Sequence, residues 1–101
     1  MTIKNKAYGT KEFEKEFGPI TFGLLLESYR LAEELSQKDL AEQLGISQSS
    51  LCDLEKCRKI PSPSRAAKMA KILGLGQKHW LEVALQDQLR EQGLSWKVSV
   101  V

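Results

Sequence analysis

The chain has 101 residues, of which 42% are hydrophobic, and this is enough for one domain with a modest core. No apolar run approaches the roughly 20 residues of a membrane span, and the first residues lack the apolar stretch of a signal peptide. The formal net charge of +2 excludes a polycation. We therefore expect a cytoplasmic protein with no membrane partner.

Apolar spacing and capping residues predict two helices in the first third of the chain. Thr10 can cap a short helix through Glu16, before Gly18-Pro19 breaks the chain. Thr21 can cap a longer helix over residues 22–35. The apolar stripe of this longer helix consists of Phe22, Leu25, Leu26, Tyr29 and Ala32.

Residues 37–56 predict two short helices joined by a tight turn. Gly45 suits the end of the first helix, Ser36 can cap its start, and Ser47 can cap the second helix. The two buried stripes consist of Leu40, Ala41 and Leu44, then Leu51 and Leu54. So short a turn leaves the helices steeply inclined and in contact, as in a helix-turn-helix. The residues left outside on the second helix are Gln48, Ser49, Cys52, Asp53 and Lys56.

The second half of the chain predicts two more helices and a strand. Residues 58–63 form a loop with two prolines, Ser64 caps a helix that runs to Leu73, and a last helix starts at Gln77 or Lys78 and runs to Gln92. Beyond Gly93, apolar and polar residues alternate, which predicts a strand over residues 94–101. A lone strand needs a partner, either the segment near Ile3, the same tail of a second copy or another protein.

The helix-turn-helix segment carries a recognisable set of residues at fixed spacing. They are Ser36-Gln37, Leu40-Ala41, Leu44-Gly45-Ile46, Leu51 and Glu55. This set resembles the lambda repressor and Cro family, also called the XRE family, and the resemblance covers roughly residues 22–75. That family usually has Gly two places after the Glu, whereas this chain has Cys57, for which a left-handed turn is less favourable. The path of the loop after the second helix is therefore left open.

The resemblance implies an all-α fold, a lambda-repressor-like five-helix bundle. To this bundle the sequence adds a short N-terminal helical arm and the C-terminal β-strand. The expected organisation is an arm at residues 1–19, a DNA-binding domain at 20–93 and a strand for dimer or partner pairing at 94–101.

Nine residues are candidate DNA contacts: Gln37, Gln48, Ser49, Ser50, Cys52, Asp53, Lys56, Arg58 and Lys59. Gln37 lies at a helix start, where its amide and the free backbone N–H groups can hold a phosphate. In the family the matching Gln does this and also supports the residue equivalent to Gln48. Gln48 itself can bond adenine through N6 and N7. Ser49 and Ser50 are short side chains that can reach a phosphate or a base edge.

The other candidates are charged groups in and after the second helix. Lys56, Arg58 and Lys59 are expected to clamp phosphates. Asp53 is repelled by phosphates, yet it can accept a hydrogen bond from cytosine N4 or turn toward Lys56 or Lys59. Residues 36–71 hold seven basic and four acidic groups, an excess that suits phosphate contact but is also ordinary for a surface. Glu55 is expected to hold the fold by bonding nearby backbone or an Arg.

The sequence gives little support for a metal site, a catalytic site or a cofactor site. Cys52 and Cys57 are expected to be free thiols, and with His79 they supply too few ligands for a structural zinc site. There is no Gly-rich phosphate loop, paired-carboxylate motif or nucleophile elbow, so we expect neither an enzyme nor a cofactor. Two functions remain, a repressor that binds a palindromic operator as a homodimer, and an antitoxin that neutralises a cognate toxin and represses its own operon.

Overall fold

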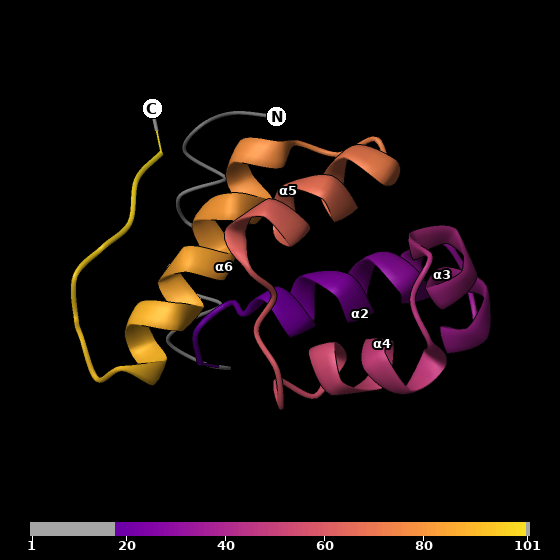
Figure 1. Ribbon diagram of the computed structural model, residues 1–101, viewed down its shortest axis with the longest axis horizontal. Coiled ribbons are helices and arrows are strands. Elements are labelled where there is room, and N and C mark those ends of the chain that lie inside the picture. Colours follow the sequence, from indigo (N-terminus) through magenta and orange to yellow (C-terminus); the bar gives the residue numbers. More distant parts are fainter. Residues whose placement is uncertain (1–17, 101) are drawn as a thin grey trace.

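The computed structural model of the protein describes residues 18–100, so the helix predicted after Thr10 lies outside the described residues. The described residues form helices at α2 (Phe22–Ala32), α3 (Gln37–Leu44), α4 (Gln48–Glu55), α5 (Pro63–Ile72) and α6 (Gln77–Glu91) (Figure 1). None of these helices combines the length and the apolar character that crossing a membrane requires.

The helices pack around one core in which α2 is central. It contacts both α4 and α6, while α5 packs on α6 and α3 packs on α4 and α5. In Figure 1, α4 lies along the lower edge of the molecule beneath α2, with α3 at the right. Phe22 of α2 meets Trp80 of α6 edge to face, with ring centroids 5.3 Å apart. The largest fully buried side chains are Phe22, Leu26, Leu40, Leu51 and Pro61.

A buried carboxylate fixes α6 against the start of α2. Asp87 Oδ2 accepts a hydrogen bond of 2.8 Å from the backbone N–H of Phe22, and Arg90 Nη1 donates to Asp87 Oδ1 at 2.9 Å. A negative charge is favourable at a helix N-terminus, where backbone N–H groups lack partners. Asp87 therefore satisfies one of these groups and sets how the two helices cross.

The same backbone motif ends all five described helices. In each, one residue has a positive φ, and the N–H of the next residue bonds the carbonyl five residues earlier at 2.8–3.0 Å. The positive-φ residues are Glu34, Gly45, Cys57, Gly74 and Gly93. The residues that follow them are Leu35, Ile46, Arg58, Leu75 and Leu94. Leu35, Ile46 and Leu75 pack on the core, whereas α4 is followed by a charged residue.

Two helix boundaries differ by more than one residue from those that the sequence predicts. The helix expected over residues 22–35 ends at Ala32, because Glu34 turns left-handed and brings Leu35 back toward the core. The cap of α5 is Ser62 and not Ser64, since the Ser62 hydroxyl accepts from Arg65 N and Pro63 occupies the first turn. Proline favours that position because its missing N–H would have had no helical partner.

The predicted C-terminal β-strand is wrong. Residues 18–100 contain no strand, and residues 94–100 run without regular structure beside α6, on the side away from α3 and α4 (Figure 1). Side chains of α6 take the place of a strand partner. Gln86 Nε2 donates to Trp96 O at 2.8 Å, Gln86 Oε1 accepts from Val98 N at 2.9 Å, and Glu82 Oε2 accepts from Val100 N at 2.7 Å.

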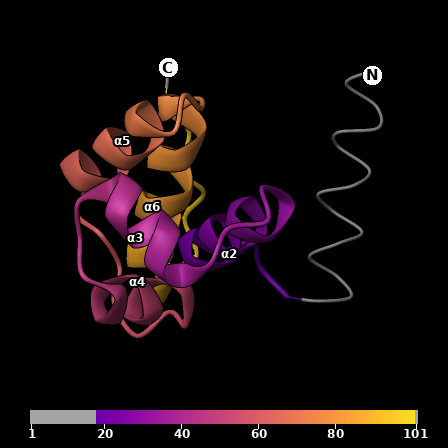
Figure 2. The ribbon, with the colours of Figure 1, turned by 90° about the vertical axis from the view of Figure 1, so that its right-hand side faces the viewer.

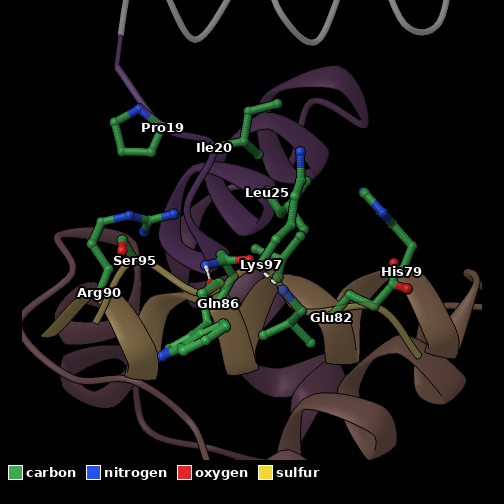
Figure 3. A pocket seen from close by; sticks show the side chains of 12 residues that line it. Pro19, Ile20, Leu25, His79, Glu82, Gln86, Arg90, Ser95 and Lys97 are labelled. Carbon is green, nitrogen blue, oxygen red and sulfur yellow. Dashed lines mark hydrogen bonds between the residues drawn. The ribbon is translucent and has the colours of Figure 1, made fainter. Parts of the chain in front are cut away.

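The tail and α6 enclose a groove of about 520 Å³ that also reaches the start of α2 (Figure 3). Pro19, Ile20 and Leu25 line it from the start of α2, Gln86 lines it from α6, and Trp96 lines it from the tail. Of the apolar residues that alternate along the tail, Val98 and Val100 are half-buried, whereas Trp96 stays 74% exposed.

Candidate nucleic-acid interface

The α3–α4 unit is built by caps at both helix starts. Ser36 Oγ accepts from Asp39 N at 3.0 Å, and Asp39 Oδ2 accepts from Ser36 N at 3.3 Å, which is a complete capping box. Ser47 Oγ accepts from Ser50 N at 3.0 Å at the start of α4. Gly45 has the positive φ that so short a turn requires, at 70°. The predicted caps and turn are thus confirmed.

One face of α4 carries the candidate DNA contacts. Gln48, Ser49 and Lys56 are exposed, and Cys52 and Asp53 are half-buried on the same face. In Figure 2, α3 lies toward the viewer and α4 at the lower edge of the molecule. The face is therefore open along the helix, with its first turn carrying two hydrogen-bonding side chains.

Ser50 differs from its neighbours because its hydroxyl is engaged in the cap. Ser47 Oγ donates to Ser50 Oγ at 2.9 Å, in addition to accepting from Ser50 N. Ser50 is also only half-exposed. Its hydroxyl oxygen therefore supports the helix start as an acceptor, while its own O–H remains a donor that a phosphate could use.

A buried ion pair joins α2, α3 and α4. Glu55 accepts from Arg30 Nε at 2.8 Å and from Arg30 Nη2 at 3.1 Å, and its side chain is only 1% exposed. Gln37 Nε2 also donates to Glu55 Oε1, at 3.0 Å. The structural role expected of Glu55 is thus confirmed, and its hydrogen bond raises the pKa of Arg30 above the usual value.

This network also decides where the Gln37 side chain lies. Its amide nitrogen bonds Glu55, and no hydrogen bond to Gln48 occurs among the described residues. One of its two amide hydrogens remains for a phosphate. Gln37 keeps its place at the start of α3, while the support of Gln48 that the resemblance implies is not formed.

Asp53 lies between two cations that follow α4. Arg58 Nε donates to Asp53 Oδ1 at 2.9 Å, and Lys59 Nζ lies 3.9 Å from Asp53 Oδ2. Arg58 Nη2 also donates to Cys52 Sγ at 3.4 Å. The bond to Asp53, then that to Cys52, raises the pKa of the Arg58 guanidinium. Asp53 therefore turns mainly toward Arg58, a pairing that the sequence did not predict.

The loop after α4 takes a left-handed turn although Cys57 stands at the position where the resemblance leads one to expect Gly. Cys57 has a φ of 61°, and its Sγ donates to Thr21 Oγ1 at 3.3 Å. Gly23 lies opposite, where a Cβ would come within 2.7 Å of Glu55 O and 2.9 Å of Cys57 Sγ. The missing side chain at Gly23 thus lets α2 lie directly against the end of α4.

Arg30 and Asp87 are the important residues that the sequence reading missed. Both carried a usable signal, because Arg30 follows Phe22 and Leu26 at a spacing of four, and Asp87 follows Val83 at the same spacing. A charged residue on a buried stripe must be paired. Their partners were not predictable, since Glu55 is 25 residues from Arg30 and Phe22 is 65 residues from Asp87.

Comparison with known proteins agrees with this geometry. A family model described as a helix-turn-helix domain matches residues 21–80, which span α2 to the first turn of α6. An uncharacterised HTH-type transcriptional regulator of Methanocaldococcus jannaschii is 40% identical over 50 residues, which are 50% of this chain and 76% of that protein. No solved structure matches the chain. The chain belongs to the helix-turn-helix domain family.

Proposed function

We propose that the protein is a sequence-specific transcriptional repressor that inserts α4 into the major groove of a palindromic operator and binds it as a homodimer. Membership of the helix-turn-helix family makes it a non-enzymatic, DNA-binding protein. Its relative in Methanocaldococcus jannaschii is named as a transcriptional regulator, which supports a regulatory role.

The observation that carries the proposal is the open first turn of α4. Gln48 and Ser49 are exposed there, on a helix whose start is fixed by the Ser47 cap. A recognition helix contacts base edges with its N-terminal residues, and an amide side chain matches adenine N6 and N7. Lys56 and Lys59 are exposed beyond the last turn, where they can reach phosphates on the flanking backbone.

The homodimer follows from the size of this reading surface. A helix of eight residues contacts few base pairs, too few to select one site among the random sequences of a genome. Two copies related by a two-fold axis place two reading helices about 34 Å apart, one DNA turn. An operator of two inverted half-sites matches that symmetry.

The experiment is selection of bound sequences from a randomised duplex library by the purified full chain. We expect an enriched inverted repeat with half-site centres one turn apart, and Gln48→Ala should weaken binding to it by about 1–3 kcal/mol and relax one base preference per half-site. Equal losses on enriched and random duplexes would refute base reading by Gln48. Sedimentation of the complex should give two chains per duplex.

A matched pair of charge variants tests the docking face. Lys59→Ala should weaken binding to all duplexes and reduce the slope of log K against log salt by about 1. Lys97→Ala removes the same charge from the tail, on the side of α6 away from α4 (Figure 1), and should leave that slope unchanged. Equal effects of the two variants would refute docking through the α4 face.

The antitoxin alternative stays a prediction of the sequence. No feature of residues 18–100 favours a toxin over any other partner. Co-purification from the native host is its test, and a stoichiometric second protein would favour it.

A further inference from the structure

We propose that Arg58 reads a guanine base beside the one read by α4, and that Asp53 is the positioning residue that aims the Arg58 guanidinium. This inference rests on the DNA-binding function proposed above. It changes the role that the sequence suggests for Arg58, from a clamp on phosphates to a reader of sequence.

Arg58 is anchored to the same residue of α4 twice. Its backbone N–H donates to Asp53 O at 2.9 Å, as part of the motif that ends the helix. Its Nε donates to Asp53 Oδ1, also at 2.9 Å. The side chain therefore turns back along α4, although it is 58% exposed and has ample room to extend into solvent.

At three of the other helix ends the corresponding position carries an apolar residue that packs on the core. Leu35, Ile46 and Leu75 follow their left-handed residues and pack on the core. Arg58 occupies that position after α4, and its side-chain hydrogen bonds go to Asp53 and Cys52 on the same helix. The turn after α4 thus serves to place a cation on the surface of the helix.

The bonds of Arg58 leave a free fork of donors. A guanidinium has five N–H groups in one plane. Asp53 takes the hydrogen of Nε, and Cys52 Sγ takes one hydrogen of Nη2, with an Nη2–Sγ distance of 3.4 Å. Nη1 and Nη2 then each keep a hydrogen on the outer edge. Two parallel donors of this kind match O6 and N7 of guanine in the major groove.

The fork lies on the correct side of α4. Cys52 and Asp53, which hold it, come one turn after Gln48 and Ser49 on the same helical face. A carboxylate on a face turned toward DNA is otherwise unfavourable, because phosphates repel it. Orienting Arg58 gives Asp53 a function there. The backbone N–H of Lys59 also donates to Asp53 O, at 3.3 Å, but its side chain is less restrained than that of Arg58, since Nζ lies 3.9 Å from Asp53 Oδ2.

The test repeats the selection from a randomised duplex library with Arg58→Lys, Asp53→Ala and, as control, Lys59→Ala. The full wild-type chain should enrich a guanine in each half-site. Arg58→Lys keeps the charge but loses the fork, so preference for that guanine should fall roughly 5- to 140-fold, with other positions unchanged. Lys59→Ala should weaken binding to all duplexes and leave the preference for that guanine unchanged.

Asp53→Ala distinguishes a role of Asp53 in positioning Arg58 from simple repulsion between Asp53 and the DNA phosphates. It removes a negative charge, so affinity for random duplex should rise while preference for the guanine falls. If affinity rises and the preference is unchanged, Asp53 does not position Arg58 and that part of the proposal is overturned. If Arg58→Lys leaves every base preference intact, Arg58 reads no base, although the proposed function still stands. If the wild-type chain enriches no sequence, both proposals fail.

Discussion

Removing Glu55 alone should destabilise the fold more than removing both partners of its buried ion pair. Glu55→Ala deletes an acceptor of three hydrogen bonds, at 2.8, 3.1 and 3.0 Å. It leaves Arg30, whose side chain is 14% exposed, without its carboxylate. Breaking a buried pair in this way costs about 3–5 kcal/mol, a large part of the 5–15 kcal/mol that stabilises a typical domain.

The double variant Arg30→Met/Glu55→Leu leaves no uncompensated charge. Apolar side chains of similar size avoid the desolvation of both ions, so the double variant should cost at least about 2 kcal/mol less than Glu55→Ala. Urea unfolding followed by circular dichroism at 222 nm measures all three proteins. A loss below about 1 kcal/mol for Glu55→Ala, or a double variant no more stable than Glu55→Ala, would refute the reasoning.

The pH dependence of the same pair follows from the sign of the Arg30 shift. Its hydrogen bond to Glu55 raises the pKa of Arg30 above its usual value, so the stabilisation is fully present below that usual pKa and is lost only as pH rises through the raised one. The difference in unfolding free energy between wild type and Glu55→Ala should therefore be constant from pH 7 to 9. A change across that range would mean that another group titrates with the pair.

Three further substitutions test the packing. Leu51→Asp places a carboxylate at a fully buried site and should unfold the protein or lower its stability by several kcal/mol, and an unchanged melting temperature would show that Leu51 is not in the core. Gly23→Ala should cost about 1–3 kcal/mol in urea unfolding despite better helix propensity, because its Cβ meets the carbonyl oxygens of Leu54 and Glu55, and a stabilised variant would contradict that close contact. Trp96→Ala should change the unfolding free energy by less than about 0.5 kcal/mol, since the side chain is largely exposed, and a larger loss would indicate a packed tail.

Local signals in the sequence were sufficient for the helices and most of their starts. Thr21, Ser36 and Ser47 each cap the helix that follows, as their position before an apolar stripe predicts. Where two serines flank a proline, as at Ser62 and Ser64, the proline decides, because it belongs inside the first turn. That rule would have placed the start of α5 correctly.

The tail shows why alternation alone did not predict its structure. Alternation of apolar and polar residues indicates only that one side of a segment is covered. It does not identify the element that covers that side. Here Gln86 and Glu82 of α6 bond the backbone at residues 96, 98 and 100. These partners are polar residues in the middle of a helix, and no spacing rule connects them with the tail.

The end of α4 depends on contacts that are distant in the sequence. A left-handed Cys57 is unfavourable locally, yet the turn brings Arg58 N to Asp53 O and Cys57 Sγ to Thr21. Gly23 gives the space for this arrangement. The residue types on the α4 face could be listed from the sequence, but the pairing of Asp53 with Arg58 follows only from the path of this turn, and so does the proposed reading of guanine.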